Sequence, residues 1–158
     1  FPNKVTELLD SFAVPANMLI FEMIESAMML DVERVKKVIQ ELSNLGIDFA
    51  IDDFGIGFSS LSLLRELPSN LIKIDRSFIS TIQSEKDNKA IVKATIDLAH
   101  SIGRSVVAEG VENDEIARLL LTMGCDYLQG DGISRPLDSD ATGLWLAQHY
   151  FDNVGLLS

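Results

Sequence analysis

Residues 47–74 read IDFAIDDFGIGFSSLSLLRELPSNLIKI and contain two apolar runs with a helical pattern between them. The runs at 47–51 and 71–74 are short and apolar, which is typical of buried strands. Residues 59–67 are predicted to form a short helix that Pro68 ends. A helix that connects two buried strands favours a parallel pair, because it returns the chain to the edge where the first strand began.

The same alternation continues on both sides of this segment. Upstream, residues 18–24 form another apolar run, and apolar residues then recur at helical spacing from Val32 to Leu45. Downstream, strands are predicted at 105–108 and 126–129. Further helices are predicted near Ser77 and at 87–102, 113–123 and 138–150. The buried face of the helix at 87–102 is predicted to consist of Ile91, Thr95, Leu98, Ala99 and Ile102.

The spacing of the strands indicates the architecture. Polar residues end the five predicted strands at intervals that average about 27 residues, near the repeat of an eight-unit barrel of ~250 residues. They are Glu22, Asp52, Asp75, Glu109 and Gln129. We therefore expect an α/β fold, a partial TIM-like (β/α) barrel with about five of eight βα units and without about the first three. The alternative is a complete doubly wound sheet, but no glycine-rich phosphate loop follows the run at 18–24.

Composition limits the classes of function. The chain has 158 residues, 47% of them hydrophobic, and a mean hydropathy of +0.20, as in a packed globular domain. Its formal net charge of −11 would repel polyanions, so we expect no nucleic-acid partner. Cys125 is the one cysteine and cannot form an internal disulfide, which fits a reducing, cytoplasmic location.

Charged residues gather where the predicted strands end. Catalytic groups of (β/α) barrels lie at the carboxyl ends of the strands. Four carboxylates at one such mouth would repel one another unless divalent cations held them. Two bound ions suit phosphodiester cleavage, and hard oxygen ligands favour Mg²⁺ or Mn²⁺ over zinc. The residues in question are Glu22, Asp52, Asp53 and Glu109, with Lys73 inside a strand.

The adjacent pair Asp52-Asp53 poses a geometric problem. Neighbouring side chains of a straight strand point to opposite faces, so both cannot face one site. Gly55 and Gly57 follow and would let the backbone turn sharply, which would allow both carboxylates to reach the site. The plainer alternative is that Asp53 only begins a turn.

Five segments of the chain, in this order and spacing, resemble the successive signatures of the EAL domain family. They are 22–26 (EMIES), 52–60 (DDFGIGFSS), 73–75 (KID), 108–112 (AEGVE) and 129–136 (QGDGISRP). The resemblance identifies the chain, residues 1–158, as a fragment of an EAL domain. It implies a (β/α)₈ barrel that hydrolyses cyclic di-GMP to linear pGpG with Mg²⁺ or Mn²⁺.

The resemblance also implies roles for individual residues. Glu22 and Asp52 would ligate the first metal ion, and Asp52 would bridge to the second. Asp53 and Glu109 would ligate the second ion, and Glu109 is also a candidate base. Lys73 would contact the attacking water or the phosphate.

Three further residues have supporting roles by the same resemblance. Glu25 would anchor the loop from Asp53 to Ser60, whereas Glu112 and Gln129 would line or support the site. The family's Glu-Ala-Leu motif and the strand with a metal-ligating Asn belong to its N-terminal third and are absent from this sequence. We therefore expect the chain alone to be inactive.

The sequence departs from the family pattern at three loop positions. Ile56 and Phe58 stand where Thr and Tyr are usual, and Asp131 stands where an aromatic residue is common. These changes concern loop control and base recognition. Two alternatives to the enzyme thus stay open, a cyclic di-GMP-binding receptor without catalysis and a protein-interaction module.

Partners follow from the same analysis. An open sheet leaves unpaired strand edges, so we expect a homodimer with residues 18–24 in or near the contact. The parent protein is expected to contain other signalling domains, such as a GGDEF or sensor domain. It is expected to place the site in the cytoplasm, with or without a membrane tether.

Overall fold

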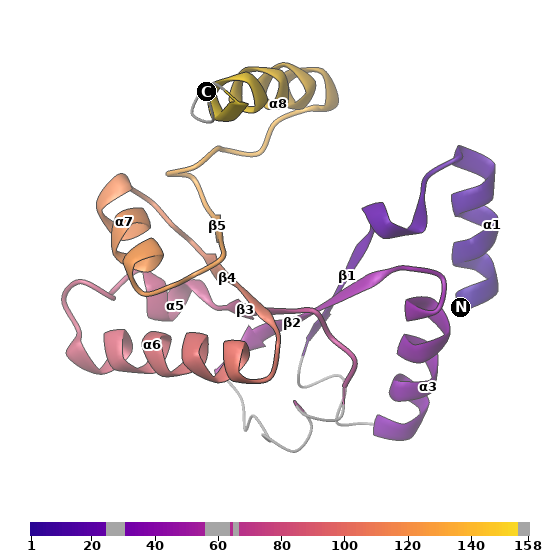
Figure 1. The fold of residues 1–158 in the computed structure, drawn as a ribbon, viewed down its shortest axis with the longest axis horizontal. Coiled ribbons are helices and arrows are strands. Elements are labelled where there is room, and N and C mark those ends of the chain that lie inside the picture. Colours follow the sequence, from indigo (N-terminus) through magenta and orange to yellow (C-terminus); the bar gives the residue numbers. More distant parts are fainter. Residues whose placement is uncertain (25–30, 56–63, 65–66, 155–158) are drawn as a thin grey trace.

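The computed structural model of the chain describes residues 1–24, 31–55, 64 and 67–154, with side chains up to His149. Its centre is a five-stranded sheet (Figure 1). The strands are β1 (Ile20–Ile24), β2 (Asp48–Phe54), β3 (Leu71–Ile74), β4 (Ser105–Glu109) and β5 (Tyr127–Gln129). All neighbouring strands pair in parallel, which confirms the predicted fold class. Their order in the sheet is their order in the sequence, with no reversal of the kind that defines a doubly wound sheet.

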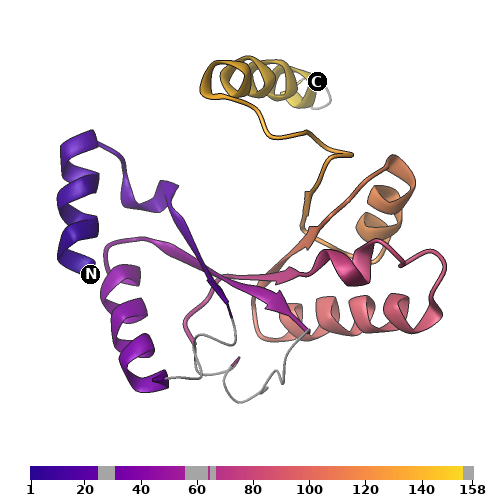
Figure 2. The same cartoon turned by 180° about the vertical axis from the view of Figure 1, so that it is seen from behind.

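Helices follow β1, β3, β4 and β5 as predicted, and two further helices precede β1. The helices are α1 (Pro2–Phe12), the 3₁₀ helix η1 (Ala16–Met18), α3 (Val32–Ser43), α5 (Arg76–Ile79), α6 (Lys86–Ser101), α7 (Asp114–Thr122) and α8 (Ser139–Val154). Figures 1 and 2 show α1 and α3 on one side of the molecule, α5 to α7 on the other, and α8 apart from the sheet. The helix predicted at 59–67 lies largely outside the described residues. No described helix has the length and apolar character that crossing a membrane requires.

The core lies on the central strands and differs from the prediction on α6. Strands β2, β3 and β4 contain fully buried residues, such as Ile72 and Val106 at 0% exposure. On α6, the buried residues are Val92, Ile96 and Ala99. Ala99 was predicted to be buried, whereas Ile91 of the predicted face is 42% exposed. The two stripes are neighbours on the helix, about 100° apart, so periodicity alone does not decide which of them packs.

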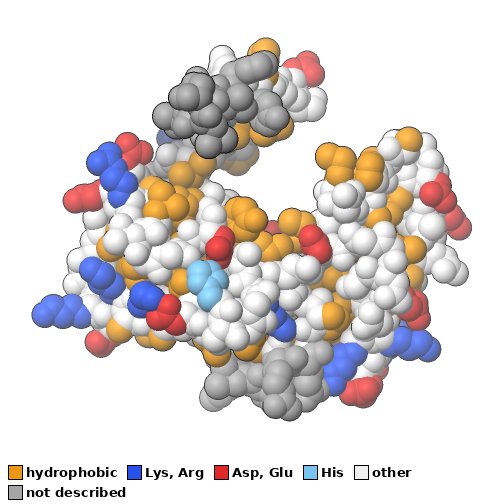
Figure 3. Space-filling model, in the orientation of Figure 1, with side chains coloured by type: hydrophobic (Ala, Val, Ile, Leu, Met, Phe, Trp, Pro, Cys, Tyr) orange, Lys and Arg blue, Asp and Glu red, His pale blue; other side chains and the backbone are white. Residues whose placement is uncertain are grey.

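The outer strands are more exposed than the central ones. Residues alternate along β1 between exposed and half-buried, and Ile20 and Ile24 are 53% and 51% exposed. The strand starts two residues later than predicted, because Met18 belongs to η1. Figure 3 shows a hollow between α8 and α1 with hydrophobic side chains on its floor. In the described part of the chain, β1 and β5 therefore form the two edges of an open sheet.

Candidate active site

Lys73 of β3 lies at the centre of a cluster of charged side chains from four strands. Its Nζ is 2.7 Å from Oε1 of Glu22 on β1, 3.3 Å from Oδ1 of Asp52 on β2 and 2.6 Å from Oε1 of Glu109 on β4. The parallel register places Lys73 opposite Val107, two residues before Glu109. The structure thus brings together four of the residues that the sequence predicted for the site. We call Glu22, Asp52, Lys73 and Glu109 the acid–lysine cluster.

The period of two along each strand explains how the cluster forms. Ile72 and Ile74 flank Lys73 and are buried in the core, so Lys73 points to the opposite face of the sheet. Ile51 and Ala108 are buried likewise, directly before Asp52 and Glu109. Burying the apolar residues of three strands against the helices therefore directs the charged residues to one side.

Burial and the neighbouring carboxylates shift the pKa of Lys73 in opposite directions. Its side chain is only 5% exposed, against 51% for Glu22, 21% for Asp52 and 19% for Glu109. Desolvation lowers the pKa of Lys73, but hydrogen bonds to Glu109 and Glu22 and the charges of Glu109 and Asp52 outweigh it. The net result is a pKa above the usual range, so Lys73 is a fixed positive charge at neutral pH.

A bulge in β2 resolves the geometry of the acidic pair. Ile51 pairs with Ile72 and Phe54 with Ile74, so three steps along β2 oppose two along β3. Asp53 takes the extra position with a left-handed φ of 56°, a conformation that Asp tolerates better than most residues. Asp53 is half-buried, and no ion pair between described residues joins it to the acid–lysine cluster. Its role as a ligand stays a prediction.

The donor set of the cluster suits a hard divalent cation. Asp52 Oδ1 is buried and makes no well-formed hydrogen bond to a described residue, although Lys73 Nζ lies nearby. A buried carboxylate oxygen held by this long ion pair alone has room for a further contact from a cation or water. In their present positions, no three described His, Cys, Asp or Glu side chains surround a common metal position. The carboxylate oxygens of the cluster are thus suitable ligands for a divalent cation, but in this structure they are arranged around the Lys73 ammonium.

Arg76 was not predicted from the sequence, yet it lies at the mouth of the same sheet. Its Nη2 is 3.8 Å from Oε1 of Glu112, and both side chains are more than half exposed. Arg76, Gly110, Glu112, Gly130 and Asp131 line a hollow of about 360 Å³. Gly110 lets Arg76 approach, since a Cβ there would lie 2.5 Å from the Arg76 Cβ. In the sequence, the signal for Arg76 as a site residue is its position directly after the KID segment (73–75) at the end of β3.

The remaining predicted residues have different positions. Gln129 is exposed and pairs in register with Glu109, and its carbonyl accepts a hydrogen bond from the Val111 N–H. A Cβ at Gly130 would lie 2.4 Å from the Val111 backbone, so the loop after β5 can pack there only with glycine. The predicted loop anchor, Glu25, lies outside the described residues.

Asp75 faces away from the cluster, as the sequence favoured. Its Oδ1 accepts a hydrogen bond of 2.8 Å from the Ser77 N–H and caps α5. Slight burial raises the pKa of Asp75, but the hydrogen bonds from Ser77 outweigh it and lower the pKa overall. Asp75 is thus committed to a helix end.

Comparison with known proteins agrees with this fold. The model of the EAL domain family matches residues 1–136. The cyclic di-GMP phosphodiesterase PdeF of Escherichia coli is 41% identical over 136 residues, which cover 86% of this chain and 18% of PdeF. The crystal structure of the EAL domain of Mycobacterium smegmatis DcpA is 38% identical with a TM-score of 0.87, over 93% of this chain and 66% of that one. A complex of the PaMucR phosphodiesterase with c-di-GMP is 36% identical with a TM-score of 0.84, over 89% of this chain and 57% of that one.

The fold is thus that of the EAL domains, which are TIM-like barrels. The chain belongs to the EAL domain family. It spans less than a fifth of the length of PdeF, and 57% and 66% of the two solved chains.

Proposed function

We propose that the domain to which this chain belongs is a metal-dependent phosphodiesterase that hydrolyses cyclic di-GMP to linear pGpG. The observation that carries the proposal is the acid–lysine cluster, in which three carboxylates from three strands meet around one buried ammonium. The name of PdeF and the ligand of the PaMucR structure support the choice of substrate.

The four carboxylates would bind metal ions, and one of them would also act as a base. Glu22, Asp52, Asp53 and Glu109 would hold Mg²⁺ or Mn²⁺ through hard oxygen ligands. Two such ions, when bound, would lower the pKa of a water and neutralise charge on the phosphate. Glu109 is also the candidate base by the family resemblance, and its carboxylate is 19% exposed and lies 2.6 Å from Lys73 Nζ.

Lys73 would act on the phosphate side of the reaction. Its ammonium is fixed in position by three contacts and is protonated at neutral pH. A preorganised positive charge gains most where negative charge develops, that is, beside the attacking oxygen or a phosphate oxygen in the transition state. Arg76 and Glu112 at the adjoining hollow would contact the rest of the nucleotide.

The parent protein and its assembly are part of the same proposal. The match to 18% of PdeF leaves room for further signalling domains in a relative of similar length. We place the site in the cytoplasm, since cyclic di-GMP is an intracellular messenger. In the 158-residue chain alone, the exposed edge of β1, with Ile20 and Ile24, would pair with a second copy, and a stable monomer in light scattering at high concentration would contradict this.

Hydrolysis of cyclic di-GMP, followed by chromatography of the product, tests the function. The complete EAL domain should form pGpG with Mg²⁺ or Mn²⁺ and lose activity with a chelator. The 158-residue chain alone should form little or none. Tight binding without turnover by the complete domain would instead identify a receptor, and neither binding nor turnover would favour an interaction module.

A further inference from the structure

The acid–lysine cluster has more negative than positive charge, and its members other than Glu22 are largely removed from water. Three carboxylates surround one ammonium, and the ammonium-bearing side chain is 5% exposed. Carboxylates this close repel one another strongly when no cation lies between them. Lys73 is the one Lys or Arg that ion-pairs with these three carboxylates in the described part of the chain. In the metal-free state it therefore supplies the attraction that holds them at one point.

Lys73 also determines which way the carboxylate oxygens point. Each of the three carboxylates directs one named oxygen at Nζ, at 2.6 to 3.3 Å. With the oxygens so directed, no three described His, Cys, Asp or Glu side chains surround a common metal position. A divalent ion requires oxygens from several of these groups at close distance. A divalent cation therefore competes with the ammonium for these oxygens, and we expect at least one carboxylate to turn away from Lys73 when the metal binds.

We propose that Lys73 is an internal counter-ion that holds Glu22, Asp52 and Glu109 together in the metal-free protein and gives up at least one of them when a divalent cation binds. The inference rests on the proposed function for its metal. It assigns Lys73 a second, positioning role that precedes catalysis. Metal affinity is consequently lower than the carboxylates alone would give, because the incoming cation must break an ion pair and remain near a positive charge.

Metal affinity of the complete EAL domain tests the inference without reference to turnover. Isothermal titration with Mn²⁺ or Ca²⁺ should show the Lys73→Met variant binding at least about tenfold tighter, since a unit charge a few ångströms from the ion is removed. Lys73→Arg, which keeps the charge, should stay near the natural protein. Lys93→Met is the matched control, because Lys93 pairs with the single carboxylate Asp97 on an exposed helix surface. Equal or weaker binding by Lys73→Met overturns the inference.

A second measurement covers failure of the variant to fold. The ¹⁵Nζ resonance of Lys73 in the unmodified domain should shift during titration with Mg²⁺ and saturate with the metal. An unchanged resonance at saturating Mg²⁺ overturns the inference even if cyclic di-GMP is hydrolysed, so the proposed function would survive. Absence of metal binding and of hydrolysis overturns both.

Discussion

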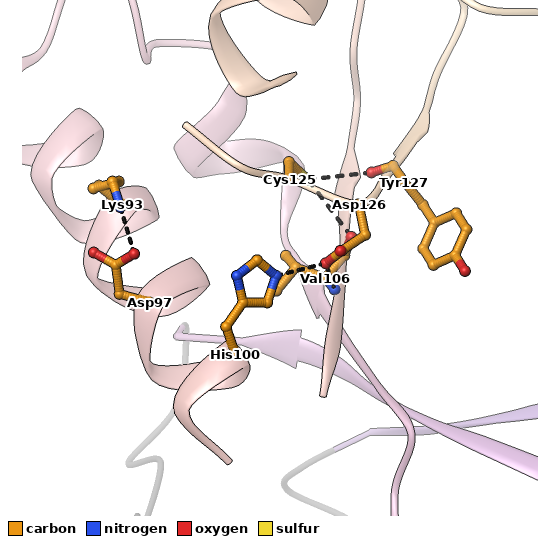
Figure 4. A network of polar contacts seen from close by, with 7 residues as sticks. All are labelled: Lys93, Asp97, His100, Val106, Cys125, Asp126 and Tyr127. Atoms are coloured by element: carbon orange, nitrogen blue, oxygen red, sulfur yellow. Dashed lines mark hydrogen bonds and ion pairs between the residues drawn. The ribbon is translucent and has the colours of Figure 1, made fainter. Parts of the chain in front are cut away.

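At the amino ends of β4 and β5, the side chains of Arg104 and Asp126 bond to backbone groups, whereas the acid–lysine cluster at the carboxyl ends of β1 to β4 consists of charged side chains that contact one another. His100 Nε2 and Asp126 Oδ2 lie 2.8 Å apart, and the same oxygen accepts a 2.7 Å hydrogen bond from the Val106 N–H (Figure 4). Cys125 donates to the Tyr127 carbonyl, and burial raises the pKa of its thiol to about 11. This end contains groups that join neighbouring elements and an unreactive thiol.

Arg104, directly before β4, belongs to the same end. It is 8% exposed, and its Nη2 donates to the Leu64 and Leu67 carbonyls, the latter at 2.6 Å. Burial lowers the pKa of Arg104 without changing its charge at neutral pH. Its Nη1 has no hydrogen-bond partner among the described residues, but the charged group is otherwise used to join β4 to the segment before β3.

The two ends of the sheet therefore differ in whether their polar contacts serve folding or function. Side chains bonded to backbone groups satisfy donors and acceptors that folding would otherwise leave buried, so stability explains them. The acid–lysine cluster has an excess of like charge, and among the described residues Asp52 Oδ1 is held there by a 3.3 Å ion pair without a hydrogen bond, which stability does not explain. Changes to this cluster should therefore reduce turnover, and changes at the amino ends should reduce the free energy of unfolding.

The largest effect is expected for Lys73→Ala in the complete domain. Turnover should fall about 100- to 1000-fold, because the fixed charge beside the developing phosphate charge is lost. Asp75→Asn is the matched control, since Asp75 also ends β3 but caps α5, and its turnover should stay nearly intact. Steady-state hydrolysis measures both. Equal losses of turnover in Lys73→Ala and Asp75→Asn would contradict the different roles assigned to the acid–lysine cluster and the α5 cap.

A smaller effect, on stability instead of turnover, is expected for Arg104→Ala. Two buried carbonyls lose their donor, which should lower the free energy of unfolding by about 2–4 kcal/mol. Arg118→Ala, at an exposed helix pair, should cost under about 0.5 kcal/mol. Denaturant unfolding of the two variants gives the difference, and hydrolysis per folded molecule should be unchanged in both. Loss of turnover in folded Arg104→Ala would show that the two ends are coupled.

The smallest effect concerns the pH dependence of stability at Asp126. Partial burial raises the pKa of this carboxyl, but bonds with His100 and the Val106 N–H outweigh it, so the folded-state pKa lies below the usual 3.8. The stabilisation is therefore present above pH about 4 and is lost as pH falls through the folded-state pKa. Asp126→Asn should lower the free energy of unfolding by about 1 kcal/mol at pH 7. It should also reduce the loss of stability that the natural protein shows as pH falls below about 4. An unfolding series from pH 7 to 3 that is the same in both proteins would contradict the assignment.

The sequence predicted the strands well because buried apolar runs have a clear signature, and each strand differs from its prediction by at most three residues at either end. It also placed polar residues at the strand ends. It did not predict that Lys73 would contact three carboxylates, since that depends on the register and twist of four strands. Nor did it place the backbone change at Asp53, because the turn was assigned to the glycines that follow. The choice between neighbouring stripes on α6 depended on packing, which periodicity does not contain.

The most direct test of a metal-dependent active site at the carboxyl ends is Asp53→Asn. Single-turnover hydrolysis should be measured beside cyclic di-GMP affinity, the latter in Ca²⁺ if that ion supports binding without turnover. The substitution keeps size and shape but removes a charged ligand, so the rate should fall about 100- to 1000-fold. Affinity should change by no more than about threefold, because the guanine bases keep their contacts. Near-normal turnover by Asp53→Asn would contradict the two-metal assignment and favour a cyclic di-GMP receptor.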